Sequence, residues 1–488
     1  MTLSAALSNA MTGLNATSRQ ADTVANNVAN ALTEGYGRRE ISLSPLQLGD
    51  EGAGVRVVGI TRASDPLITA PRRVAQAAVG RDAALAEAQS RLSQSVGEPG
   101  QPGALATLAD RFDAALTAAA DTPESATLLS STALAASDYA RGFNTVSNQI
   151  NALRTDADAS IARQVDQINA ALQDVERLND EIRNNSFSGA DIAALQDQRH
   201  RLIDRISDSV PVRVIQRENN TVALFATNGA QLLDGRAYTL EFTPTPIVTQ
   251  DMTLAGGPLS GISINGQPIP VGQGDGGGLL DGGALEAQFI LRDTTLPEAA
   301  AQLDAVARDL VERVQGLPAD PTLGVGDAGL FTDGGIAFDP LNQEGLAGRL
   351  SVNPLVDPAL GGDPNLLRDG INAVAPGDQG DDTVLRGLQD ALTAPAAIIS
   401  APGLTGQRGN AAFTAQFSGF MLSASVEADA RASLQVGRLQ TLSDAEANAV
   451  GVDTDRELSD LLVIEQAFAA NARVIQVVDE LLERLLLI

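Results

Sequence analysis

The sequence of 488 residues contains no cysteine, no lysine, no tryptophan and a single histidine, His200. Without cysteine the chain can form no disulfide, no thiolate nucleophile and no cysteine zinc site. One histidine also rules out a multi-histidine metal centre within one chain. We therefore expect no metal and no cofactor, and most metallohydrolase and cysteine-protease chemistry is excluded.

Positive charge is also scarce, because 33 arginines face 61 acidic residues and the formal net charge is −28. Nucleic-acid affinity comes chiefly from basic side chains that release phosphate counterions, so we expect no nucleic-acid partner. Residues 1–80 hold seven arginines against six acidic residues, whereas residues 231–400 hold seven against 23. The near-neutral start can pack against copies of itself, while the acidic middle stays solvated and repels its neighbours.

Long apolar runs are missing as well. No run approaches the ~20 residues that span a bilayer, and the first 18 residues, MTLSAALSNAMTGLNATS, lack the basic and apolar regions of a cleavable signal. We therefore expect neither membrane insertion nor a cleaved leader.

Both ends of the chain carry apolar and small residues in the alternating four-three spacing of a heptad seam. The N-terminal seam includes Leu3, Leu7, Leu14, Val24 and Val28. The C-terminal seam consists of Leu461, Ile464, Phe468, Asn471, Ile475, Val478, Leu482 and Leu485. Such helices are marginal alone, so each end is expected to find a partner. A polar residue in a seam, here Asn471, lowers stability but can fix the register.

The middle of the chain predicts a multidomain α+β architecture. Residues 1–35 and 455–488 would form terminal coiled-coil assembly helices. Residues 36–210 and 400–454 would form a long antiparallel helical bundle, with a short extended excursion at 38–60 and helical periodicity that resumes at about residue 81. From Pro211, β-branched stretches separated by turn residues predict strands. Residues 211–399 would be one or two inserted β-rich or irregular outer domains, rich in Gly, Pro and Asp, with a helix near 284–315.

Residues 18–38 resemble the N-terminal signature of bacterial flagellar rod, hook and hook-associated proteins. The residues that match it are Asn26, Asn27, Asn30, Thr33, Gly35, Tyr36 and Arg38. Asparagine amides on a packed surface can supply donors and acceptors to adjacent subunits. A glycine that accepts positive φ and an anchoring tyrosine would end the first helix.

Three further stretches, residues 10–15, 195–206 and 466–475, are most similar to the hook-associated protein 1 family, which joins hook and filament. The resemblance implies a structural subunit with no enzymatic activity. It would be exported unfolded by the flagellar type III apparatus and polymerise at the distal end of the hook, outside the cell. Implied partners are copies of itself, hook protein, the second junction protein (hook-associated protein 3), and a cytoplasmic export chaperone that holds residues 455–488.

Two other functions are alternatives to this one. Another axial flagellar subunit shares parts of the pattern, but hook and rod proteins generally lack a helical block as long as 81–210, and filament subunits lack the Gly-Tyr-Arg exit. A secreted carboxylate hydrolase would need a paired acid and base. The acidic residues are dispersed, and no HExxH, GxSxG or GxxxxGK[ST] pattern occurs. The Gly-rich stretch 272–283 could suggest calcium, but one copy without repeated ligand spacing is more simply a pair of turns.

Overall fold

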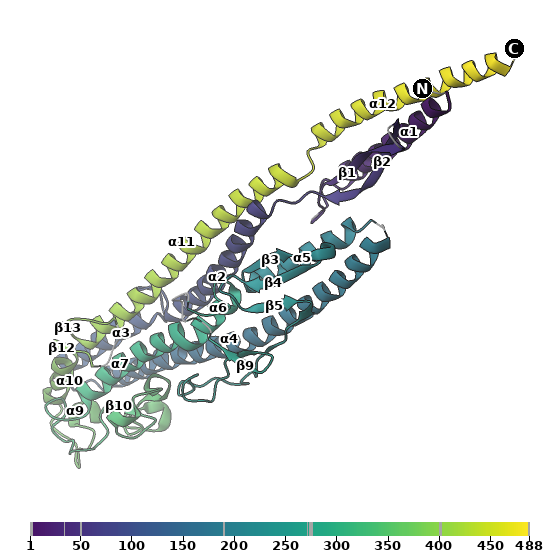
Figure 1. Ribbon diagram of the computed structural model, residues 1–488. Coiled ribbons are helices and arrows are strands. Elements are labelled where there is room, and N and C mark those ends of the chain that lie inside the picture. The colour runs from purple at the N-terminus through teal and green to yellow at the C-terminus, as the bar shows by residue number, and fades with distance from the viewer. Residues whose placement is uncertain are drawn as a thin grey trace.

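The chain forms an elongated molecule in which long helices run beside several small antiparallel sheets (Figure 1). The computed structural model describes residues 3–33, 35–48, 51–188, 191–270, 272, 277–399 and 403–486. Both chain ends lie at the same extremity (Figure 1). This arrangement confirms the predicted multidomain α+β class.

The extremity that carries both ends is here called the terminal unit. It consists of α1 (Leu3–Ala29), the antiparallel strands β1 (Arg39–Leu48) and β2 (Glu51–Arg62), and α12 (Thr454–Leu486). Helix α1 packs against α12 on one side and against the hairpin on the other. The hairpin occupies the stretch for which the sequence predicts an extended excursion.

The remainder, residues 66–450, is here called the body, and its frame is helical. It contains α2 (Pro66–Val96), α3 (Leu105–Asp121), α4 (Ala126–Ser188), α5 (Ala193–Ser209) and α11 (Asn410–Val450). Helix α4 has 63 residues and is therefore about 95 Å long at 1.5 Å per residue. Helices α2 and α11 lie side by side, and α11 leads into α12 (Figure 1).

Helix α2 begins earlier than the predicted start near residue 81. Asp65 caps it, because its carboxylate accepts a hydrogen bond of 2.9 Å from the Leu67 amide, and Pro66 fits the first turn. The cap starts the helix before its apolar periodicity becomes clear. Helix α2 ends at Val96 and α3 ends at Asp121.

The strands predicted after Pro211 are present, as two small antiparallel sheets. One sheet has the order β3 (Val212–Gln216), β4 (Val222–Ala226), β5 (Gln231–Asp234) and β6 (Arg236–Ala237), with the 3-10 turn η1 (Glu218–Asn220) between its first two strands. The other has the order β7 (Leu240–Glu241), β8 (Ile262–Ile264) and β9 (Gln267–Ile269).

The chain then returns to helix through α6 (Ala284–Ile290), one π-helical segment η2 (Leu291–Thr295) and α7 (Leu296–Val314), along the stretch for which a helix near 284–315 is predicted. Short elements follow. They are β10 (Phe331–Asp333), η3 (Pro340–Asn342), α8 (Leu346–Arg349), β11 (Leu350–Val352), η4 (Pro358–Leu360), α9 (Leu366–Asp369), α10 (Thr383–Thr393), β12 (Ala396–Ala397) and β13 (Gln407–Arg408).

Buried apolar side chains of the body form two clusters that share α4. One joins residues 88–157 with residues 291–421 and contains Tyr139, Phe143 and Phe413. The other joins residues 161–175 of α4 with residues 203–289. The predicted domain limits stay a prediction. The burial groups residues 291–399 with the helices and not with the sheets, because α7 packs along α4 and buries its apolar face there.

Candidate assembly site

The predicted seams on α1 and α12 face each other within one chain. On α1, Val24 is buried, and Leu3, Leu7, Leu14 and Val28 are half-buried. On α12, Val478 is buried, Leu461, Ile464, Asn471 and Ile475 are half-buried, and Phe468 and Leu482 are 42% and 40% exposed. The Leu485 side chain lies outside the described residues. The two helices pack against each other and leave part of the predicted seams exposed.

Asn471 is seated on Gly13 at the middle of this pair. A Cβ atom on Gly13 would lie 2.8 Å from Oδ1 and 2.9 Å from Nδ2 of Asn471, so a larger residue leaves no room for the amide. Asn471 also donates a hydrogen bond of 3.1 Å to the Ala467 carbonyl. The match of a glycine with a polar side chain gives a physical basis for the predicted role of Asn471 in register.

A second apolar row lies beside the first seam on α12, and sequence reasoning missed it. Its members, Val463, Ala467, Ala470, Val474, Val477 and Leu481, are spaced four, three, four, three and four residues apart. We call this row the second seam. Val463 is 63% exposed, Val474 44%, Val477 50% and Leu481 42%. The spacing was visible in the sequence, but it overlaps the first seam on neighbouring positions.

The same tail has one property that the sequence reading did not expect. One stretch within Asn410–Arg484 is long and apolar enough, by length and composition, to cross a membrane, with a mean hydropathy of 1.4 over 18 residues, of which 6% are buried. Along α12, however, Glu465, Asn471 and Arg473 interrupt the apolar surface. Charged side chains in a bilayer core cost at least ~2.5 kcal/mol each, so these residues favour a protein neighbour over lipid.

Asn27 ties the end of α1 to both the exit loop and α12. Its amide nitrogen donates to the Arg39 carbonyl and to Glu457 Oε2, both at 3.0 Å. Its amide oxygen accepts from the Tyr36 hydroxyl and from the Arg39 amide, both at 2.9 Å. Asn27 is 1% exposed, as is Glu457. Because two donors and two acceptor lone pairs are the whole capacity of an asparagine amide, Asn27 is committed within its own chain.

The other signature residues lie near Asn27 in the sequence. Asn26 is exposed, and its carbonyl accepts a hydrogen bond of 2.9 Å from the Asn30 amide, while Thr33 donates to Asn30 Oδ1 at 3.3 Å. Gly35 has φ +74°, and a Cβ there would lie 2.6 Å from Arg201 Cγ. Burial is the main cause that raises the pKa of Tyr36, so its hydroxyl stays a donor at neutral pH.

Arg38 binds Glu457, the same carboxylate that Asn27 binds. Its Nε lies 2.7 Å from Glu457 Oε1, and its Nη1 lies 2.7 Å from Glu40. The hydrogen bond to Glu457 is the main cause that raises the pKa of Arg38. The signature therefore joins α1, the hairpin and the first turns of α12 into one unit.

A second carboxylate, Asp197 of α5, receives three hydrogen bonds from the hairpin. The Gly37 amide donates to Oδ1 at 3.0 Å, Arg62 Nε to Oδ1 at 2.7 Å and Arg39 Nη2 to Oδ2 at 2.7 Å. Asp197 is 4% exposed. Sequence reasoning assigned it no role, although it lies inside the stretch 195–206 that carries the family resemblance.

About two turns further along α5, Asp204 joins α5 to α2. Arg72 Nη2 and Arg73 Nε both lie 2.7 Å from Asp204 Oδ1, and Arg72 Nε lies 2.6 Å from Glu446 of α11. His200 lies beside these arginines. Burial, with help from their positive charge, lowers the pKa of His200 to about 3, so the imidazole is neutral at pH 7 and is no ion-pair partner of Asp204.

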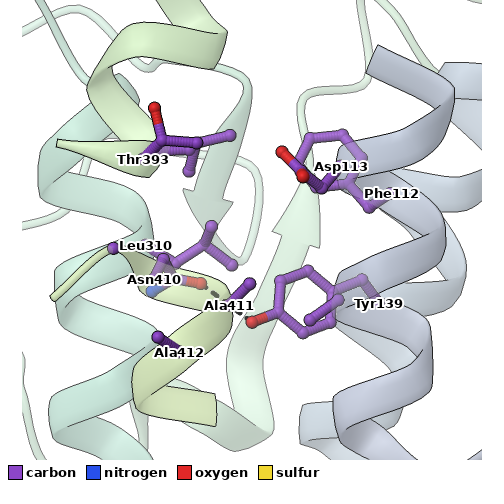
Figure 2. A pocket seen from close by; sticks show the side chains of 11 residues that line it. Phe112, Asp113, Tyr139, Leu310, Thr393, Asn410, Ala411 and Ala412 are labelled. Atoms are coloured by element: carbon purple, nitrogen blue, oxygen red, sulfur yellow. Dashed lines mark hydrogen bonds between the residues drawn. The ribbon is translucent and has the colours of Figure 1, made fainter. Parts of the chain in front are cut away.

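A cavity of about 230 Å³ lies at the far end of the body, between α3, α4, α7 and the start of α11 (Figure 2). The Tyr139 hydroxyl points to Asn410 Oδ1 at 2.8 Å and also lies 2.6 Å from Thr414 Oγ1. The Asn410 amide donates to Asp309 at 2.8 Å. These polar groups are hydrogen-bonded to one another. Within the described residues, no group of three or more His, Cys, Asp or Glu side chains is placed to hold a metal.

Three regions of the chain match family models of flagellar proteins. Residues 90–320 match the family model of the flagellar hook-associated protein FlgK helical domain. Residues 447–487 match the C-terminal model of the flagellar basal body rod FlgEFG proteins, and residues 7–36 match the flagella basal body rod protein model. A flagellar hook-associated protein 1 from Bacillus subtilis is 23% identical over 98% of this chain and 97% of its own length. The chain is similar to flagellar hook-associated proteins of the FlgK family.

Other relatives match over shorter stretches. Flagellar hook-associated protein 1 from Escherichia coli is 26% identical over 48% of this chain and 44% of its own length. A solved structure of the flagellar hook junction protein FlgK from Burkholderia pseudomallei aligns with a TM-score of 0.43 and 22% identity, over 56% of this chain and 47% of that chain. This similarity supports a structural role in the bacterial flagellum, in assembly with other flagellar components.

Proposed function

We propose that this chain polymerises at the distal end of the hook and forms the hook–filament junction, outside the cell. The observation that carries the proposal is the second seam of α12. Most of the first seam is buried or half-buried beside α1 of the same chain, whereas the second presents Val463, Val474, Val477 and Leu481 to solvent. Two adjacent heptad seams on one helix suit a helix with a partner on each side. The second partner is a terminal helix of a neighbouring copy.

The distribution of charge supports the same arrangement. Residues 1–80 are nearly neutral in a chain of net charge −28, so copies can approach one another at this end. The acidic middle lies in the body, at a distance from the chain ends (Figure 1). The terminal units would therefore line the inside of a tube, and the bodies would project outward.

The further partners follow from the family and from the exposed tail. The terminal units contact hook protein on one side and hook-associated protein 3 on the other. Before export the second seam would expose apolar surface in the cytoplasm, so a chaperone that holds residues 455–488 in a groove covers it. The absence of cysteine suits export of an unfolded chain by the type III apparatus, because no disulfide can form before assembly.

Deletion and complementation test the proposal. Cells without the gene should grow hooks without filaments and release filament monomer into the medium. The unaltered chain should restore motility. Val477→Asp should not, because it places an unpaired charge in the contact between copies, at a cost of several kcal/mol.

Gln476→Asp is the matched control, since Gln476 is exposed on α12 but belongs to neither seam. It should restore filaments. Deletion cells that lack hooks would indicate a rod or hook subunit instead, and motile Val477→Asp cells would show that the second seam is no assembly contact.

A further inference from the structure

The terminal unit and the body meet at a narrow joint. The chain passes between them at residues 63–65 and 451–453, which belong to no helix or strand. Beside the first of these segments, Asp197 of the body accepts hydrogen bonds from Gly37, Arg39 and Arg62 of the terminal unit. Two short connections and one buried carboxylate thus lie where the two parts join.

The charges make Asp197 difficult to replace. The side chains of Arg39 and Arg62 are each 12% exposed, and both guanidinium groups share this one carboxylate at 2.7 Å. Nη1 of Arg39 is buried without a hydrogen-bond partner, so this arginine has no alternative acceptor at that nitrogen. Removal of the Asp197 charge would leave two half-buried cations side by side, which repel each other.

The positions of the two arginines fix the orientation of the hairpin relative to α5 and not only a point of contact. Arg39 is the first residue of β1 and Arg62 is the last residue of β2, and the two are paired across the hairpin. Asp197 is therefore hydrogen-bonded to both strands at the same end of the hairpin. A carboxylate held by both strands and by a backbone amide resists rotation of the hairpin about α5, which a single bond would not.

We propose that Asp197 is a positioning residue that sets the angle between the terminal unit and the body. This inference rests on the proposed function for its meaning. Copies in a helical array occupy equivalent environments, so each must present its second seam at the same angle to its body. A subunit with a loose joint would present that seam in many directions.

The test measures the angle directly in the isolated full-length chain. The chain has no native cysteine, so Arg56→Cys on β2 and Gln167→Cys on α4, both at exposed positions, accept one nitroxide label each. Electron–electron distance measurements should give one narrow distribution in the parent. Asp197→Asn should abolish the narrow peak while the unfolding curve of the body stays unchanged.

Asp204→Asn is the matched control, because Asp204 lies on the same helix and binds two arginines within the body. It should keep the narrow peak. Arg39→Gln/Arg62→Gln removes the same contact from the other side and should broaden the distribution as Asp197→Asn does, even if Asp197→Asn itself folds poorly.

Three outcomes would overturn the inference: a narrow distribution in both joint variants, a parent as broad as the variants, or equal broadening by Asp204→Asn. None of them depends on hooks or filaments. The proposed function would still stand on the Val477→Asp phenotype, so the failure of one proposal is distinguishable from the failure of the other.

Discussion

The body and the terminal unit differ in how far they bury their apolar side chains. The body encloses most of its own, as Leu92, Phe143 and Phe413 show with no exposed surface, and the exception is the second half of α11, where Val426 is 70% exposed and Leu434 72%. The terminal unit leaves much of its apolar surface open, and α12 has one buried apolar side chain among its described residues, Val478. A helix that is apolar on more than one face is normally buried. The comparison indicates that the body completes its fold within one chain and that the terminal unit completes its fold in the assembly.

The polar contacts differ in the same way. In the body, buried charges are paired deep inside, as Arg292 and Asp158 are at 2.6 Å with no exposure of either side chain. In the terminal unit, the paired charges lie at its base, around Glu457 and Asp197, and the helices beyond the base carry apolar seams. Buried ion pairs demand good geometry and full pairing. The terminal unit is thus fixed at its base and open along its length.

The largest expected effect lies in the body. Phe143 is fully buried and packs on Tyr139, with ring centroids 5.1 Å apart. Phe143→Ala should lower the free energy of unfolding of the body by ~3–5 kcal/mol, because the cavity cannot collapse fully. Chemical denaturation measures it. Phe468→Ala in the terminal unit, where Phe468 is 42% exposed, is the comparison and should leave that transition unchanged. Equal losses would mean that the two regions share one cooperative core.

A smaller effect should depend on pH. The pKa of His200 is lowered to about 3 in the folded chain, below its ordinary value of about 6.5. The unfolded chain therefore binds more protons between these values, and this part of the stability is complete above pH 6.5 and lost as the pH falls toward 3. Between pH 7 and pH 4 the loss should be of the order of 3 kcal/mol. Denaturation of the parent and of His200→Gln at pH 7 and pH 4 measures it.

His200→Gln should show a smaller loss of stability between the two pH values than the parent. Because His200 lies in the body, hydrogen exchange in α1 and α12 should not follow it. A parent and variant with the same pH dependence would contradict the account of a buried neutral imidazole.

The sequence predicts the elements that follow from local residue patterns. It does not predict contacts between residues that lie far apart along the chain. The heptad spacing predicts both terminal helices, and the β-branched stretches after Pro211 predict the strands. The start of α2 at Pro66 was missed because a cap, and not periodicity, determines it. The hydrogen bonds of Asp197 join it to residues at least 135 positions away, and no spacing rule indicates such pairs. The predicted seam and signature residues stay predictions as assembly contacts, although the structure brings Asn27, Tyr36 and Arg38 together.

The smallest effect should appear inside the terminal unit, at the register contact. Gly13→Leu would push its side chain into the place of the Asn471 amide, which lies within 3 Å of a Cβ at this position. The α1–α12 pair should lose ~1–3 kcal/mol, as for overpacking elsewhere. Hydrogen exchange of α12 should rise, while that of α4 stays constant. Asn471→Ala combined with Gly13→Leu makes room for the new side chain and should recover most of the protection. If Gly13→Leu leaves the exchange of α12 unchanged, the two helices do not hold this register in solution, and the terminal unit would be open along its first seam as well as its second.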